Sequence, residues 1–429
     1  MMLSLPTYDC YKDSGVDWLG EIPQTWELTS GRTCFAQQEI KNKGNQETTV
    51  LSLSYGNIVI KPEAKLDGLV PESFETYQIV DVGNIIIRST DLQNDKTSLR
   101  VGLVKNKGII TSAYLCLVTN EKIKPEFAYY LLHAYDLLKV YYGMGSGLRQ
   151  NLSFTDFKYL KLPLPPIEEQ EKIVKFLDKK CEEVEKSIEL KQRLIALLDE
   201  QKSIVINQAV TKGLNPNAPM KDSGIDWLGD IPAHWEVKKL KYVCKIFRGK
   251  FTHRPRNDPK LYDGKYPFVQ TGDIARARKF LTTYNQTLNE KGLRVSTLIP
   301  KGTVLITIAA NIGDITILNF DSCFPDSVVG FYPYQILKRD FLYYALVSMK
   351  QKFINSSIQN TQMNLNVERI GVNFILIPPI EEQEKIVEYL EEKTAEIEEL
   401  KEKTLQQIEK LKELKQILIA EAVTGKIKV

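Results

Sequence analysis

Basic side chains gather in one segment of the second half of the chain, where their types and spacing favour phosphate binding. The segment, residues 245–279, is interrupted by glycine and proline, which is typical of loops. Its basic residues are Lys245, Arg248, Lys250, Arg254, Arg256, Lys260, Arg276, Arg278 and Lys279. Because guanidinium and ammonium groups bind phosphate oxygens, we expect these side chains to contact a polyanion.

Amide and arginine side chains form further sets, which suit hydrogen bonding to the edges of bases. One set lies between two expected strands of the first half and comprises Arg88, Gln93, Asn94, Lys96, Arg100 and Lys105. Two more precede the last expected strand of each half and comprise Arg149, Gln150 and Asn151 in the first and Gln359, Asn360 and Gln362 in the second. Each segment alone is compatible with an ordinary solvated loop. Together they predict a surface that binds double-stranded DNA.

The net charge of +3 is unevenly distributed along the chain. Residues 238–350 contain 19 Lys or Arg against 8 Asp or Glu, whereas residues 28–161 contain 16 against 13. Two helical stretches, residues 167–212 and 381–429, hold 18 basic and 23 acidic residues together. Such concentrated positive charge in a globular segment favours nucleic acid as the ligand. The alternative is a basic surface that only maintains solubility.

Motifs for nucleotide-dependent or metal-dependent catalysis are absent from the sequence. It has no GxxxxGK[ST] motif, and the glycines of residues 143–147 follow an expected helix rather than a strand. The histidines, His133, His234 and His253, lack metal-ligand spacing, and the 6 cysteines include no CxxC pair. We expect His133 to have a packing role, the cysteines to be reduced, and neither metal nor cofactor to be bound.

Nuclease and methyltransferase chemistry also lack their motifs. Glu200 and Lys202 have nuclease-like spacing, but they lie in the middle of a long helical stretch, which predicts a solvated face. The Pro-Pro pairs at 165–166 and 378–379 each precede an acidic helix start, unlike the NPPY type of base-methylating enzymes. Proline followed by acidic residues is a helix start signal. We therefore expect a protein without catalytic residues.

Length and composition indicate a globular protein of two or three domains. The 429 residues are 43% hydrophobic and 26% charged. No apolar run approaches twenty residues, and the first residues lack the basic start and apolar block of a signal peptide. We expect a cytoplasmic location.

Two near-identical blocks show that the chain is a tandem duplication. PPIEEQEKIV occurs at residues 165–174 and again at 378–387, and KDSGVDWLGEIPQTWE at residues 12–27 returns as KDSGIDWLGDIPAHWE at 221–236. Between these blocks the two halves barely resemble each other. A repeated framework with divergent inserts predicts a protein that reads two different things from one rigid frame.

Each insert is expected to be a mixed α+β domain. Expected strands cover residues 48–56, 84–89, 101–104 and 113–120 in the first insert and 302–310, 313–319 and 327–334 in the second. Residues 125–142 and 339–355 have helical spacing. The predicted domains are residues 1–164 and 213–377, separated by long helices over residues 165–212 and 378–429.

Apolar residues recur at alternating spacings of three and four along both long helices, which is typical of a coiled coil. The predicted seam comprises Leu177, Val184, Ile188, Ile195 and Leu198 in the first helix and Leu390, Ile397, Ile408, Leu411 and Leu418 in the second. Since a compact insert separates the helices, we expect them to pair antiparallel within one chain, with pseudo-twofold symmetry. The alternatives are two independent linker helices or an intermolecular coiled coil.

These motifs together resemble the specificity subunit of type I restriction-modification systems. The resemblance covers nearly the whole chain and includes QAVTKGL at residues 208–214 and EAVTGKI at 421–427, which close the two helices. It implies two target recognition domains, each reading one half of a bipartite DNA sequence, while the helices fix the unread gap. It also implies two methyltransferase subunits and further restriction and translocase subunits as partners, so methylation and cleavage would belong to other chains.

Base-contacting positions cannot be transferred by motif, because recognition domains of this family vary too much. The DNA-binding residues above therefore rest on loop chemistry alone. The divergent inserts predict an asymmetric target, since identical readers on a twofold frame would select a palindrome. Two other classes of protein remain open: a self-contained nuclease or methyltransferase fused to recognition domains, and a coiled-coil scaffold whose inserts bind RNA or nothing.

Overall fold

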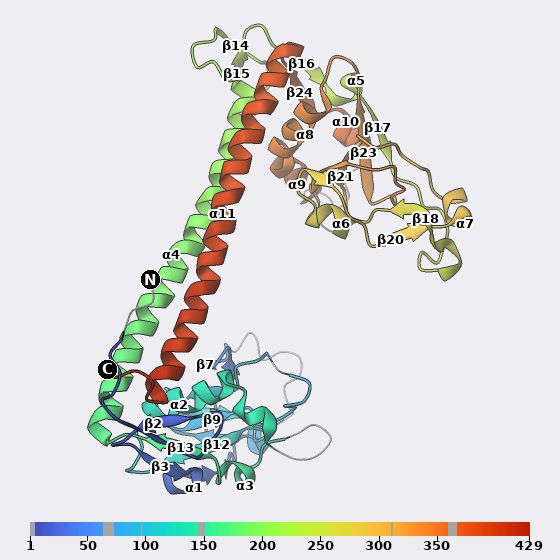
Figure 1. Cartoon of the computed structure of the whole chain (residues 1–429). Helices are drawn as coiled ribbons and strands as arrows, with labels where there is room; N and C mark the ends of the chain where they lie inside the picture. The colour runs from blue at the N-terminus through green and yellow to red at the C-terminus, as the bar shows by residue number, and fades with distance from the viewer. Residues whose placement is uncertain (1–4, 63–72, 96, 145–150, 310–311, 359–366) are drawn as a thin grey trace. The chain divides into compact units, whose positions relative to one another are not determined.

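The computed structural model describes residues 5–62, 73–95, 97–144, 151–309, 312–358 and 367–429. The chain divides into two compact units, residues 1–192 with 405–429, and residues 193–404. Two long helices, α4 (Ile167–Lys212) and α11 (Ile380–Val423), run through both units. The start of α4 and the end of α11 belong to the first unit, and the end of α4 and the start of α11 belong to the second. Each unit thus combines one insert with a segment of both helices (Figure 1). Among the helices described, none is both long and apolar enough to cross a lipid bilayer.

The first unit is built from short antiparallel ladders. Its strands are β1 (Tyr11–Asp13), β2 (Glu21–Pro23), β3 (Glu27–Ser30), β4 (Phe35–Gln38), β5 (Ile40–Lys41), β6 (Leu51–Ser54), β7 (Asn57–Ile60), β8 (Gln78–Val80), β9 (Ile85–Ile87), β10 (Val101–Leu103), β11 (Gly108–Ile110), β12 (Leu115–Thr119) and β13 (Lys161–Leu164). Its helices besides the long ones are α1 (Gly31–Cys34), α2 (Pro125–Leu137) and α3 (Phe154–Phe157), with 3-10 turns η2 (Phe74–Thr76) and η3 (Val140–Gly143). The main sheets have the orders β10-β9-β12-β4 and β11-β8-β5. The apolar face of α2, including Phe127 and Leu131, shares one core with Ile85 and Ile87 of β9.

The second unit has a larger sheet. Its strands are β14 (Met220–Asp222), β15 (Asp230–Pro232), β16 (Glu236–Lys239), β17 (Cys244–Arg248), β18 (Tyr262–Phe268), β19 (Phe280–Leu281), β20 (Gln286–Leu288), β21 (Val304–Thr307), β22 (Ile315–Leu318), β23 (Val328–Pro333) and β24 (Phe374–Ile377). Its shorter helices are α5 (Leu240–Val243), α6 (Thr271–Arg276), α7 (Glu290–Arg294), α8 (Arg339–Ser348), α9 (Lys350–Ile358) and α10 (Val367–Gly371), with the 3-10 turn η4 (Pro259–Leu261). The five-stranded sheet has the order β17-β23-β21-β22-β19, with β19 parallel to β22.

The expected strands of both inserts are present, but the two expected helices end early. Strands β6, β9, β10, β12, β21, β22 and β23 lie within the predicted ranges. Helix α2 ends at Leu137, because Lys139 adopts a left-handed φ of 62° and a 3-10 turn follows. The helix predicted at 339–355 is divided at Met349 into α8 and α9. The mixed α and β fold class with long paired helices is confirmed.

The repeated blocks close each insert in the same way. Strand β3 pairs with β13 and strand β16 pairs with β24, so the residues after each Trp-containing block join the residues before each Pro-Pro pair. Trp26 and Trp235 of the two blocks are 1% and 0% exposed. The duplicated sequence therefore forms the base of each unit, and the divergent sequence lies between its two strands.

Each long helix ends against a buried tryptophan. Gly213, just after α4, has a φ of 72°, and a Cβ there would lie 3.1 Å from the Trp235 ring. Gly425, just after α11, has a φ of 75°, and a Cβ there would lie 3.3 Å from the Trp26 ring. Glycine tolerates both the positive φ and the close approach of the ring. The frame of the first unit is thus completed by the end of α11.

A buried glutamine fixes the start of each long helix to its insert. Gln170 donates to the carbonyls of Lys122 and Pro165, at 3.0 and 2.9 Å, and accepts from the Lys124 amide at 2.9 Å. Gln383 donates to Ile336 and Pro378, at 3.0 and 2.8 Å, and accepts from the Lys338 amide at 2.8 Å. Both glutamines are 0% exposed. The Q of the PPIEEQ segment therefore joins the helix start to the residues that precede α2 or α8.

Replacing Gln383 by alanine is expected to lower the free energy of unfolding of the second unit by about 2–3 kcal/mol, because it removes three hydrogen bonds, one of them buried and two partly buried. The neighbouring Glu384→Ala, at an exposed side chain that pairs with Lys338, is expected to change it by about 0.5 kcal/mol or less. Chemical denaturation followed by hydrogen exchange in residues 336–390 measures both. Equal effects of the two substitutions would contradict this role of the glutamine.

The long helices pair antiparallel in both units. In the first unit, Lys415 contacts Glu185 and Lys191 contacts Gln407. In the second, Lys401 contacts Asp199 and Lys202 contacts Glu398. From one contact to the next, the residue number increases along α4 and decreases along α11, so the two helices run antiparallel. Of the predicted seam residues, Leu177, Val184, Leu198, Leu390, Ile397, Ile408 and Leu418 are buried, and Ile188, Ile195 and Leu411 are half-buried. Lys202, expected on a solvated face, instead forms an interhelical ion pair.

Candidate DNA interface

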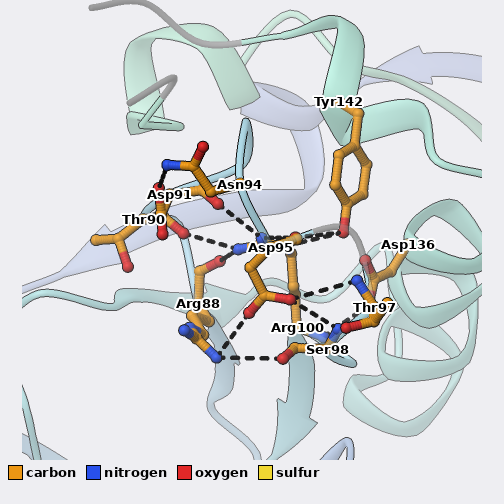
Figure 2. Close-up of polar contacts among 10 residues, drawn as sticks. All are labelled: Arg88, Thr90, Asp91, Asn94, Asp95, Thr97, Ser98, Arg100, Asp136 and Tyr142. Carbon is orange, nitrogen blue, oxygen red and sulfur yellow. Dashed lines mark hydrogen bonds and ion pairs between the residues drawn. The ribbon is translucent and has the colours of Figure 1, made fainter. Parts of the chain in front are cut away.

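Arg100 does not have the exposed position that the sequence predicts for it. Its side chain is 0% exposed, and each of its five guanidinium N–H groups has an acceptor (Figure 2). Nε donates to the Tyr142 hydroxyl at 3.1 Å, Nη1 to the carbonyls of Arg88 and Thr90 at 3.0 and 2.8 Å, and Nη2 to the carbonyls of Asp91, at 3.2 Å, and Asp95. The prediction that Arg100 contacts DNA is therefore wrong, because its side chain, just before β10, lies inside the protein with all its donors bonded.

The loop from Arg88 to Ser98 is held together by charged groups. The side chain of Arg88 is 34% exposed and lies 3.1 Å from Asp95 Oδ2. Hydrogen bonds from the hydroxyl and the backbone amide of Ser98 lower the pKa of Asp95 to about 2, with a smaller contribution from Arg88. Gln93 and Asn94 are exposed on this loop. The loop thus presents two amide side chains from a backbone that is fixed from inside.

Asn151 and Leu152 lie against Ser89 and Asp91, from which they are far apart in the sequence. The Asp91 amide donates to Asn151 Oδ1 at 3.0 Å, and the Leu152 amide donates to the Ser89 carbonyl at 2.8 Å. Asn151 immediately follows the predicted residues Arg149 and Gln150, which lie outside the described residues, as does Lys96. Lys105 is exposed between β10 and β11 and borders a separate hollow with Tyr129.

Three predicted arginines of the second unit converge on one residue, Asp326. Arg256 lies 2.5 Å and Arg254 lies 3.7 Å from the Asp326 carboxylate, and Arg248 Nε donates to the Asp326 carbonyl. All three arginines are exposed. One carboxylate against three guanidinium groups leaves a positively charged surface. Asp326 was not predicted, because 70 residues separate it from Arg256 and only the fold brings them together.

A hollow of about 590 Å³ lies beside this cluster. Lys245, Arg248 and Lys250 line it together with Phe247 and Tyr332. Lys245 and Tyr332 are paired neighbours on β17 and β23, and both are exposed. Cationic groups beside aromatic faces are the kind of surface that contacts nucleic-acid backbones and bases.

The basic residues 276–279 divide between surface and interior. The side chains of Arg276 and Arg278 are 64% and 80% exposed, and they lie 2.7 Å from Asp273 and 3.7 Å from Glu402, respectively. Lys279 is 16% exposed, lies 2.7 Å from Asp340 Oδ1 and also contacts Glu391 of α11. Lys279 therefore fixes the segment to the long helix, while the two arginines remain available. The predicted residues Gln359, Asn360 and Gln362 lie outside the described residues.

The ion pair of Lys279 and Asp340 predicts a pH-dependent stability of the second unit. Burial alone would raise the pKa of Asp340, but hydrogen bonds from Lys279 and Arg339 outweigh it and hold this pKa below its usual value. A lowered carboxylate pKa contributes stability above the ordinary value of about 4 and loses it as the pH falls through the folded value. We expect Asp340→Asn to remove this contribution, so that the stability difference from the unsubstituted chain shrinks on acidification.

Thermal unfolding between about pH 2 and pH 7 measures that difference. Glu392→Gln, which removes an exposed carboxylate on α11, serves as the control. A stability difference for Asp340→Asn that stays constant over this range would contradict the assigned ion pair.

His133 packs inside the first unit, as predicted. It is 8% exposed and stacks on Tyr129 with ring centroids 5.7 Å apart. Burial, with a smaller contribution from Lys415, lowers its pKa to about 4. This neutral ring is part of the support beneath the candidate interface rather than part of the interface.

Comparison with known proteins decides the family of this chain. The sequence matches the family model of the type I restriction modification DNA specificity domain over residues 19–199 and 232–410. The chain belongs to this family. It is 26% identical over 435 residues to a putative type I restriction enzyme specificity subunit, MjaX, of Methanocaldococcus jannaschii, with 96% of both chains covered. It is 24% identical to the EcoBI specificity subunit of Escherichia coli, with 72% of this chain and 67% of that protein covered.

Solved structures share the fold of this specificity subunit. A chain from a study of complex assembly and conformational transition of the type I restriction-modification system superposes with a TM-score of 0.71 at 19% identity, covering 95% of this chain and 99% of that one. The HsdS subunit of Thermoanaerobacter tengcongensis superposes with a TM-score of 0.53 at 19% identity, covering 95% and 98%. Specificity subunits recognise DNA sequence, are in general non-catalytic, and form complexes with methyltransferase and restriction subunits.

Proposed function

We propose that each insert of this specificity subunit reads one half of an asymmetric bipartite DNA target, and that α4 and α11 set the unread spacer between the halves. The observation that carries the proposal is one repeated frame, with the same buried glutamine and tryptophan in each unit, bearing two different polar surfaces. The first surface consists of amides on a fixed loop, and the second is an arginine cluster. Two inserts with different polar surfaces, held by equivalent frames, would select half-sites of different sequence.

We further propose that two methyltransferase subunits and the restriction and translocase subunits supply the catalysis. A surface that supports such partners lies on α4 in the second unit, where Leu194, Leu197 and Ile204 are 38%, 52% and 48% exposed. Their spacing of three and seven residues places them on one helix face. Exposed apolar side chains at this spacing favour docking of a partner helix.

Selection of duplexes from a randomised library tests this function, using the full chain with and without methyltransferase subunits. The expected result is enrichment of two short, unlike blocks at a fixed separation. Enrichment of a single uninterrupted block, or no enrichment, would overturn the proposal. Methylation or cleavage by the chain alone would instead identify a self-contained enzyme, and absence of any binding to duplex DNA would favour the scaffold.

The exposed arginines predict a salt-dependent contribution to binding. Arg278→Ala is expected to weaken binding to all duplexes and to reduce the slope of log affinity against log salt concentration by about 1, because one phosphate contact is lost. Lys403→Ala removes the same charge from an exposed position on α11 that pairs with Glu399, and it is expected to leave the slope unchanged. Titrations at several salt concentrations measure both. An unchanged slope for Arg278→Ala removes this residue from the interface.

A further inference from the structure

We propose that Arg100 is a positioning residue that sets the conformation of the loop over residues 88–95 and thereby the discrimination of one half-site. The inference rests on the proposed function, because it assigns a reading role to that loop. Arg100 itself lies below the surface and is not among the residues that would touch DNA. It acts through the backbone of the residues that do.

The guanidinium group forms the centre around which the loop folds. Four of its five hydrogen bonds go to backbone carbonyls between residues 88 and 95, and the fifth goes to the hydroxyl of Tyr142 (Figure 2). The planar guanidinium group presents five N–H donors in fixed directions, whereas the ammonium group of a lysine presents three donors on a flexible side chain. The backbone path of the loop is therefore determined by the shape of one side chain.

The surroundings of Arg100 tolerate a buried cation. Its backbone amide donates to Asp136 Oδ2 at 2.6 Å, and Asp136 is 1% exposed. Burial raises the pKa of Asp136, while the hydrogen bond from Arg100 and the nearby positive charges oppose that rise. Burying an uncompensated charge is expensive, so a cation held here by carbonyl dipoles and a nearby carboxylate indicates a specific requirement for its geometry.

The exposed amides lie directly above the fixed backbone. Asp91, whose carbonyl accepts from Arg100, has a left-handed φ of 59°, and its side chain accepts from Asn94 Nδ2 at 2.8 Å. Its amide also donates to Asn151 Oδ1, so Asn151 is fixed to the same point. Hydrogen bonds to base edges require close control of donor and acceptor positions. A change in the Arg100 contacts therefore shifts the amides of the loop and Asn151 at once.

Tyr142 extends the same control. Its hydroxyl accepts from Arg100 Nε and donates to the Asp95 carbonyl at 3.1 Å. Its neighbour Tyr141 lies in the same 3-10 turn, but the Tyr141 hydroxyl donates to the Leu132 carbonyl of α2 at 2.8 Å instead. The two tyrosines thus form a matched pair in which the Tyr142 hydroxyl bonds to the reading loop and the Tyr141 hydroxyl bonds to α2.

The experiment compares Tyr142→Phe, Arg100→Lys and the control Tyr141→Phe in the full chain with methyltransferase subunits. The probes are the duplex that the unsubstituted protein selects from a randomised library, and duplexes with single base-pair changes in one half-site or the other. We expect Tyr142→Phe and Arg100→Lys to reduce discrimination in one half-site about tenfold while leaving the other half-site unchanged. Affinity for unrelated duplexes should stay within about twofold, because phosphate contacts are retained.

Tyr141→Phe, which loses a buried hydroxyl of the same kind, is expected to lower the melting temperature by a similar amount without changing discrimination in either half-site. If Arg100→Lys does not fold, Tyr142→Phe still decides the outcome. Unaltered discrimination in Tyr142→Phe, or equal loss in Tyr141→Phe, would overturn the inference. Failure of the unsubstituted protein to select a bipartite duplex would overturn the proposed function instead.

Discussion

Replacing Trp235 by alanine is expected to lower the free energy of unfolding of the second unit by about 3–5 kcal/mol, since it removes a large, fully buried side chain. The ring is 0% exposed and belongs to the same core as Leu240, Ile377 and Ile386. Its Nε1 donates to Glu382 at 3.0 Å, so the substitution also breaks a contact with the first turn of α11. The cavity left by the substitution would remove the packing of the repeated block against both long helices.

Trp227→Ala is the matched control, because Trp227 belongs to the same repeated block but is 45% exposed. Its ring packs under Lys352 Nζ, which lies 3.6 Å from the ring centroid, a contact that contributes about 1 kcal/mol at an exposed site. Hydrogen exchange of the second unit in increasing urea measures both variants separately from the first unit. Comparable losses in the two variants would show that Trp235 is not a central support of the frame.

Inserting seven residues into each long helix is expected to change the spacer of the DNA target without changing either half-site. The insertions belong within residues 190–201 of α4 and the opposing residues 399–408 of α11, where Asp199 meets Lys401. Seven residues preserve the apolar register of the seam and add about 10 Å of helix. At 3.4 Å per base pair, the proposed ruler predicts a spacer longer by about three base pairs.

Library selection or sequencing of methylated sites in a host that expresses the variant measures this change. A variant in which the same residues of both helices are replaced by other helix formers, without a change in length, should keep the original spacer. A lengthened pair that selects the original spacer would show that the helices do not set the gap.

The repeated frame was predictable because its signals are local and periodic. The seam residues follow from spacings of three and four, and most of them recur at the equivalent position of the other helix, so the burial of Leu177 and Leu390 needs no knowledge of the inserts. The strand ranges follow from short β-branched runs between turn residues. The helix ends do not follow, because the left-handed turn at Lys139 depends on packing around Tyr142 rather than on a glycine.

The candidate interface was less predictable because side-chain direction depends on distant partners. Arg100 and Lys105 have similar sequence surroundings, yet one is buried and the other is exposed. The partners that bury Arg100 include Tyr142, 42 residues away, and the partner that gathers the arginines of the second unit is Asp326. No spacing rule relates such residues. Basic composition predicted the surface, whereas individual contacts required the fold.

In the part of the chain that the structure describes, the buried glutamine of each frame hydrogen-bonds to main-chain atoms of its insert. Gln170 meets the carbonyl of Lys122 and the amide of Lys124, and Gln383 meets the equivalent atoms of Ile336 and Lys338. Main-chain atoms are the same for every amino acid, proline apart, so mutation of these insert positions leaves the junction intact. During evolution an insert can therefore be exchanged or diverge in sequence while its attachment to the long helix is retained. New DNA specificity can arise without any change at this junction.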